Sequence, residues 1–157
     1  MPADLRVDWI ADDGVAVPRF GKERARTLLG MALDQAKRRG AFALTVRFVG
    51  QAEAARLHEA HFADPTTTDV MTFPDGSVDP GSGRILLGDL AVCVDVARRE
   101  AASRRRTVAD ETLLYILHGM LHLLDHDDRT PALRRRMWAA QVDLLGRIGV
   151  ALEAEPG

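Results

Sequence analysis

Two periodicities of hydrophobic residues divide this chain of 157 residues into strands and helices. Apolar and polar residues alternate over residues 5–9 and 43–49, as they do in half-buried β-strands. Residues 66–74 are typical of a turn that enters a short strand. Residues 85–94 form a long apolar strand in which Gly88 is a candidate break. The pattern therefore predicts a sheet of about four strands.

Helical spacing of apolar residues predicts three helices, over residues 20–39, 51–62 and 95–103. A fourth helix should begin at Thr107, because its spacing to Asp110 matches a capping box. A fifth should begin at Thr130 and Pro131, which suit the cap and the first helical position. Strands mixed with helices, followed by helices alone, predict one α+β domain over residues 1–157, a small mixed sheet packed by about five helices.

Composition restricts the class of protein. The hydrophobic fraction of 46% and the charged fraction of 28% are those of a folded globule, not of a disordered or fibrous chain. Cys93 is the single cysteine, so an internal disulfide is excluded and a reducing compartment is expected. The first residues lack the basic start and apolar core of a signal peptide, and no apolar stretch could span a bilayer. We therefore expect a cytoplasmic protein.

The most informative polar residues are His118 and His122, four positions apart on the fourth predicted helix. Residues four apart share one helix face, so both rings can reach one ion. Residues 112–117 are almost entirely apolar, so the helix should be buried, and buried rings need a partner such as a metal. Gly119, unfavourable inside a helix, indicates that something large packs against the backbone. The pattern predicts a metal site in the C-terminal half.

A third ligand must come from beyond this helix, where His126, Asp127 and Asp128 are the candidates. Two histidines at this spacing also occur in metalloproteases, but Gly119 stands where those enzymes place their general-base glutamate. The spacing thus supports a metal without a protease mechanism. Asp128 lies six residues past His122, far enough for the chain to turn back, whereas His126 is the commoner type of zinc ligand but lies nearer the helix.

Three segments resemble the motifs of one family and occur in the family's order. Residues 118–128 read His-Gly-Met-Leu-His-Leu-Leu-Asp-His-Asp-Asp. This is similar to His-Gly-x-Leu-His-Leu-x-Gly-Tyr-Asp-His of the YbeY family of ribosomal-RNA maturation endoribonucleases. Residues 68–74 resemble the family's Thr-Asp-Val-Leu-Ser-Phe-Pro, and residues 88–90 resemble its Gly-Asp-Ile. The resemblance extends over nearly the whole chain.

The resemblance implies a zincin-like fold and a hydrolase that cleaves single-stranded RNA with one Zn²⁺ per chain. It implies a role in ribosomal RNA maturation and ribosome quality control, with ribosomal RNA and the small ribosomal subunit or ribosome-associated proteins as partners. The family's three motif histidines bind zinc, and Asp128 occupies the third position here. The expected ligands are therefore His118, His122 and Asp128, with His126 as the alternative third ligand. The alternative function is a ribosome- or RNA-associated binding protein whose metal is structural.

Catalytic candidates are fewer than metal ligands. An arginine thought to serve catalysis in the family is replaced by Phe62, so either another arginine such as Arg98 substitutes for it or the activity is weak. Asp69 and His126 are the other catalytic candidates, although Asp69 lies in a segment typical of turns. Asp89 is expected to orient a ligand histidine through its second ring nitrogen.

The arginines are unevenly distributed in a chain whose formal net charge is −2. The expected RNA-binding residues are Arg98, Arg99, Arg104, Arg105 and Arg106. A second run occupies residues 134–136. Either run alone is more typical of a solvated helix face. Phosphate binding is expected only if both runs face the metal site.

Overall fold

The computed structural model describes residues 3–62 and 69–153 and contains one mixed sheet. Its strands are β1 (Asp4–Ala11), β2 (Ala41–Val49), β3 (Val70–Pro74) and β4 (Ile85–Cys93). They lie in the order β1-β2-β4-β3. The β1, β2 and β4 strands are parallel, and β3 runs antiparallel to β4. The two edges of the sheet are therefore β1 and β3.

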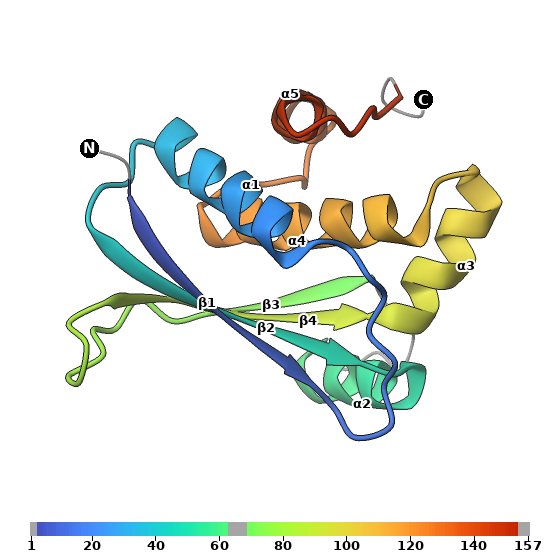
Figure 1. Ribbon diagram of the computed structural model, residues 1–157, viewed down its shortest axis with the longest axis horizontal. Helices are drawn as coiled ribbons and strands as arrows, with labels where there is room; N and C mark the ends of the chain where they lie inside the picture. The colour runs from blue at the N-terminus through green and yellow to red at the C-terminus, as the bar shows by residue number, and fades with distance from the viewer. Residues whose placement is uncertain (1–2, 63–68, 154–157) are drawn as a thin grey trace.

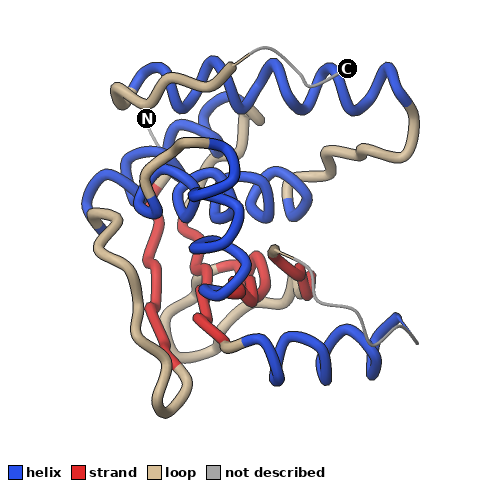
Figure 2. The backbone as a smooth tube through the Cα atoms, turned by 90° about the vertical axis from the view of Figure 1, so that its right-hand side faces the viewer, coloured by secondary structure: helices blue, strands red, loops and turns tan. Residues whose placement is uncertain are grey.

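Helices cover the two sides of the sheet unequally (Figure 1). They are α1 (Lys22–Gln35), α2 (Gln51–Phe62), α3 (Val94–Arg104), α4 (Val108–Leu123) and α5 (Pro131–Arg147). The α1 and α4 helices lie over one face of the sheet, and α5 packs on both of them from outside. The α2 helix lies on the other side of the strands, as Figure 2 shows. The helix α4 is thus enclosed between the sheet and α5.

The described residues form four strands and five helices, which confirms the predicted α+β class. Both predicted helix caps are present: the Asp110 amide donates to Thr107 Oγ1 at 3.0 Å, and the Leu133 amide donates to Thr130 Oγ1 at 3.1 Å. These bonds satisfy amides that the first turn of a helix leaves without a partner. The zincin-like character of the fold stays a prediction.

The first helix is shorter than the sequence pattern predicts. It begins at Lys22 and ends at Gln35 rather than continuing to residue 39. The chain leaves the helix because Lys37 adopts the left-handed conformation, with φ of 58°, and the Arg38 amide donates back to the Leu33 carbonyl at 2.9 Å. In the predicted turn before β3, residues 66–68 lie outside the described part of the chain.

Gly88 forms a β-bulge within its strand, which corrects the expectation of a break there. Ala43 pairs with Leu86 and Leu44 pairs with Gly88, so Leu87 is the extra residue. Gly88 has φ of 141°, and a Cβ atom there would lie 2.3 Å from the carbonyl oxygen of Phe73. The glycine therefore allows β3 to approach β4 closely, which places β3 beside α4.

The α4 helix is the centre of the core. All its residues from Glu111 to Leu117 are buried, which explains why residues 113–117 are almost entirely apolar. None of the helices in the described ranges combines the length and the apolarity that a membrane span requires.

At Gly119, α4 approaches the sheet so closely that a Cβ would lie 2.8 Å from Leu90 Cδ2 and 3.1 Å from Val70 Cγ2. This contact confirms the expectation that something large packs against Gly119.

We predict that Gly88→Ala destabilises the protein by at least about 2 kcal/mol, because the new methyl group meets immovable backbone and alanine disfavours this φ. Gly30→Ala, within α1, is the matched control, since nothing lies within 4 Å of the position that its methyl group would take. That control should be stabilising by about 0.5–1 kcal/mol. Urea unfolding measures both, and equal stabilities for the two variants would contradict the bulge as described.

Candidate metal centre

The last two turns of α4 bring two imidazoles together. The Nε2 atoms of His118 and His122 lie 3.1 Å apart, and their rings meet edge to face. Asp128 approaches from the segment between α4 and α5, with its Oδ2 atom 3.4 Å from His122 Nε2 and 3.9 Å from His118 Nε2. All three ligand-type atoms lie within 4.8 Å of one another. The structure thus gathers the three residues expected to bind metal.

The turn after α4 explains how Asp128 returns to the histidines. The Asp125 amide donates to the His122 carbonyl at 3.1 Å, and the His126 amide donates to the Leu121 carbonyl at 2.9 Å. This pair of bonds is a Schellman motif. The position that Asp125 occupies in this motif is usually glycine, because the φ angle there must be positive. Asp125 accepts that conformation with φ of 71°. The reversal of the chain places Asp128 over the end of the helix.

Two acceptors hold the far side of the imidazoles. His118 Nδ1 lies 2.7 Å from Oε1 of Gln141, on α5, and His122 Nδ1 lies 3.1 Å from the carbonyl oxygen of His126. A ring nitrogen that faces such an oxygen carries the hydrogen and donates it. The Nε2 atom of each ring then keeps its lone pair. Sequence reasoning missed Gln141, whose signal is a polar residue between Met137 and Leu144 on the buried stripe of α5.

The donor set and its spacing fit a zinc ion. Two ligand atoms about 2.0–2.1 Å from a tetrahedral zinc lie about 3.3–3.4 Å apart, close to the separations observed here. Two lone pairs that face each other at 3.1 Å repel unless a cation lies between them. The Asp128 carboxylate adds a negative charge at the same point. Two imidazoles and one carboxylate are ligands that zinc accepts.

The cluster lies in a pocket of about 340 Å³ between α4, α2 and β3. His58 and Asp69 line this pocket together with Val70, Met71 and Thr72. Asp69 is anchored at the start of β3, because its Oδ1 accepts from the Val70 amide at 2.7 Å and its carbonyl accepts from the Cys93 amide at 2.9 Å. The pocket therefore presents a carboxylate and an imidazole besides the cluster.

The other residues after α4 serve the turn and not the cluster. His126 contributes its carbonyl oxygen, and its ring is outside the group formed by His118, His122 and Asp128. Burial, with a smaller contribution from the charge of His122, lowers the pKa of His126 below its usual value. Asp127 accepts two hydrogen bonds from Arg129, which lower the pKa of Asp127 to about 2.

Two candidate residues lie outside the metal pocket. The catalytic candidate Arg98 donates to the Ala16 carbonyl at 2.6 Å, in the loop after β1, and it does not line the metal pocket. Asp89 does not orient a ligand histidine, because Gln141 and the His126 carbonyl take both Nδ1 atoms. Asp89 is exposed on β4 and lines a separate, smaller pocket. The side chain of Phe62 lies outside what the structure describes.

Two arginines of the expected RNA-binding cluster pair with a buried carboxylate. Glu111 on α4 is fully buried, and it pairs with Arg106 at 2.9 Å and Arg104 at 3.2 Å. The side chain of Arg106 is only 9% exposed, and it also pairs with Glu153. Glu111 precedes His118 by seven residues, or about 10 Å along the helix. Arg104 and Arg106 therefore compensate a buried charge away from the metal pocket, and their RNA-binding role stays a prediction.

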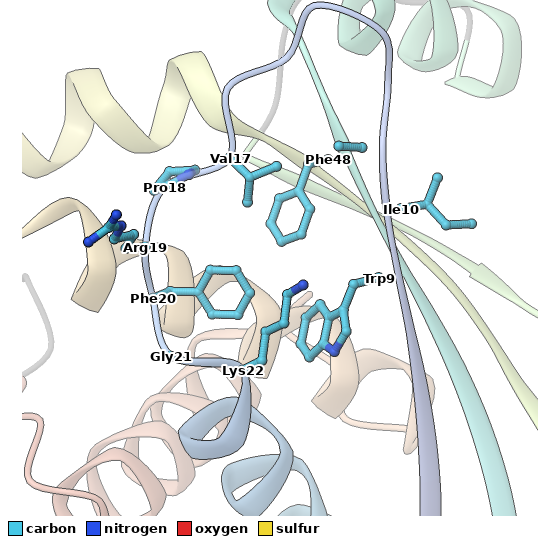
Figure 3. A pocket seen from close by; sticks show the side chains of 10 residues that line it. Trp9, Ile10, Val17, Pro18, Arg19, Phe20, Gly21, Lys22 and Phe48 are labelled. Atoms are coloured by element: carbon cyan, nitrogen blue, oxygen red, sulfur yellow. The ribbon is translucent and has the colours of Figure 1, made fainter.

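A larger cavity, of about 510 Å³, lies at the opposite edge of the sheet, between β1 and the loop that follows it (Figure 3). Trp9, Phe20 and Phe48 surround it, with ring centroids 5.2–6.3 Å apart. Arg19 and Lys22 are its charged residues, and its lining contains neither a carboxylate nor an imidazole. Of these two pockets, the smaller one beside β3 therefore holds the side chains suited to acid–base chemistry and metal binding.

A family model described as Endoribonuclease YbeY matches residues 12–149 of this chain. The chain belongs to the YbeY endoribonuclease family. A protein of Bordetella avium named Endoribonuclease YbeY is 37% identical over 143 residues, which are 87% of this chain and 86% of that protein. One of Thermobifida fusca with the same name is 34% identical over 156 residues, 96% of this chain and 99% of that protein.

The fold of this YbeY family member also resembles a solved structure. The solution structure of TM1509 from Thermotoga maritima superposes with a TM-score of 0.57 and covers 97% of this chain and 99% of its own. The two sequences are 18% identical, so this likeness concerns the fold alone.

We predict that Arg106→Met destabilises this YbeY family member by about 3 kcal/mol, because it leaves the buried Glu111 carboxylate poorly compensated. Arg99→Ala, on α3, is the control: that side chain is 56% exposed and should matter by less than about 0.5 kcal/mol. Thermal and urea unfolding measure the difference. Unchanged stability in the Arg106 variant would show that the arginine is free for another role.

Proposed function

We propose that this chain is a zinc-dependent endoribonuclease that cleaves single-stranded RNA. The observation that carries the proposal is the pair of imidazole Nε2 atoms 3.1 Å apart, with the Asp128 carboxylate beside them. Family membership supports it, because relatives that match most of the chain are named endoribonucleases. His118, His122 and Asp128 would hold one zinc ion per chain.

A three-ligand set is typical of a catalytic zinc site, whereas structural zinc sites have four protein ligands. Within the described residues, the cluster contains three such side chains. When bound, zinc would supply Lewis acidity that polarises a phosphodiester oxygen or makes a water molecule more acidic. The cluster opens into the 340 Å³ pocket, which gives an RNA phosphate access. This arrangement favours catalysis over the alternative of an RNA-associated protein with a structural metal.

Asp69 is our candidate for the residue that accepts a proton during hydrolysis. Its backbone is fixed by the hydrogen bond from Cys93 to its carbonyl, and it lines the pocket that contains the metal cluster. A positioned carboxylate of this kind can deprotonate a water molecule next to a bound phosphate. His58, on the α2 wall of the same pocket, is a second group able to move a proton.

Cations near the cluster would attract the RNA backbone. The arginine that contacts the main chain of Asp128 is Arg134, whose Nη1 donates to the Asp128 carbonyl at 3.3 Å. It belongs to the arginine run at residues 134–136, in the first turns of α5. We infer that this run, more than the residues between 98 and 106, faces the phosphates of the substrate. Binding should therefore weaken as salt rises.

The biological setting is proposed from the family resemblance. We infer that the substrate is ribosomal RNA, that the protein works in ribosomal RNA maturation and ribosome quality control, and that it acts in the cytoplasm. The small ribosomal subunit or proteins bound to it would then be its partners. Family membership supports an RNA substrate.

We predict that the purified protein contains about one zinc per chain, because its three ligands form one open site. His118→Ala and His122→Ala should lose the metal, while Asp128→His should retain it, since imidazole also binds zinc. His61→Ala is the control, because that histidine packs against Phe73. Elemental analysis measures the metal. Full zinc content in both alanine variants would refute the site.

We also predict that Asp69→Asn lowers the rate of RNA cleavage by about 10²-fold or more while zinc content stays unchanged, as for loss of a general base. A labelled single-stranded oligoribonucleotide is the substrate, and cleavage is followed on gels. His118→Ala serves as the control for contaminating nucleases. A fully active Asp69→Asn protein would exclude Asp69 as the proton acceptor, and cleavage by His118→Ala would exclude the metal pocket as its source.

A further inference from the structure

Gln141 is a buried polar residue on a helix face that is otherwise apolar. It lies on α5 with its side chain directed at α4, and it is 2% exposed. Met137, four residues before it, and Leu144, three residues after it, are both buried on the same stripe. Its Oε1 atom lies 2.7 Å from His118 Nδ1. This contact joins α5 to the metal cluster.

Such a residue would be unfavourable at this position without its partner. Burial of an amide costs about 1–3 kcal/mol unless its hydrogen bonds are made, whereas methionine or leucine would fill the stripe at no such cost. Stability alone therefore favours an apolar side chain at residue 141. The hydrogen bond to His118 gives a different reason for a glutamine at residue 141, because it determines which ring nitrogen of His118 keeps a lone pair.

The two histidines of the cluster obtain their second partners in different ways. His122 donates to the main-chain carbonyl of residue 126, which any amino acid at that position would provide. His118 depends on a side chain from another helix, so its orientation requires a particular residue at 141. The residue at position 141 also determines which tautomer His118 adopts, because an oxygen acceptor at Nδ1 leaves the lone pair on Nε2.

We propose that Gln141 is a positioning residue for His118. By accepting the Nδ1 hydrogen it fixes the tautomer and the ring plane, so that the Nε2 lone pair points toward His122 and Asp128. The inference rests on the proposed function in one respect, namely that the cluster binds zinc. It makes α5 part of the metal centre, although α5 supplies none of the three ligands. The Gln141 amide is neutral, so it orients the His118 ring without adding to the negative charge of Asp128.

Zinc affinity of four proteins tests the inference. The zinc-loaded wild type, Gln141→Met, Gln141→Glu and Gln35→Met are titrated with a chromophoric chelator. Gln141→Met keeps the length of the side chain but has no acceptor, so its zinc affinity should fall by about 10–100-fold. Gln141→Glu keeps an acceptor oxygen and should bind zinc at least as tightly as the wild type. Gln35 is exposed at the end of α1 and makes one long hydrogen bond, at 3.4 Å, to Asp143, so the same substitution there should leave zinc affinity unchanged.

Ring-nitrogen NMR of the wild type gives a readout that needs no variant. With ¹⁵N-labelled histidine, the His118 Nδ1 should carry a hydrogen-bonded proton in the zinc-loaded protein. A proton on Nε2 of His118, or equal zinc affinity of Gln141→Met and wild type, would overturn the proposal. If circular dichroism shows that Gln141→Met is unfolded, the NMR result and the Gln141→Glu affinity decide. Failure of the wild type to bind zinc would instead overturn the proposed function.

Discussion

Two imidazole nitrogens that face each other at 3.1 Å form the contact on which this site depends. Each ring donates from its other nitrogen to an oxygen, so both facing atoms carry lone pairs, and the Asp128 carboxylate lies beside them. Such an arrangement is electrostatically unfavourable until a cation joins it. The surrounding fold holds the three groups in place, so the folded chain favours a cation at this point.

The close packing of α4 on the sheet gives the cluster its rigidity and its pocket. Gly119 directly follows His118 in sequence and allows the helix backbone to meet Leu90 and Val70. Gly88 allows β3 to approach β4 at the bulge, so the start of β3 becomes a wall of the metal pocket. A helix held farther from the sheet would separate the histidines from Asp69. These two glycines therefore connect packing to the geometry of the site.

Local sequence signals predicted much of this arrangement. The caps at Thr107 and Thr130 place both C-terminal helices, and the four-residue spacing of His118 and His122 indicates two members of the cluster. The third, Asp128, came from its position in the family motif. Three features depend on tertiary contacts, which local patterns do not encode. Gln141 acquires its importance only from the crossing of α5 over α4. The roles of Arg104 and Arg106 depend on the buried Glu111, and the bulge at Gly88 depends on the position of β3.

Crystals of the zinc-loaded protein, measured at wavelengths on both sides of the zinc absorption edge, would locate the bound ion. We predict one anomalous peak per chain, about 2.0–2.1 Å from Nε2 of both His118 and His122 and bonded to Asp128. Coordination through an Nδ1 atom, or a peak away from the end of α4, would contradict it.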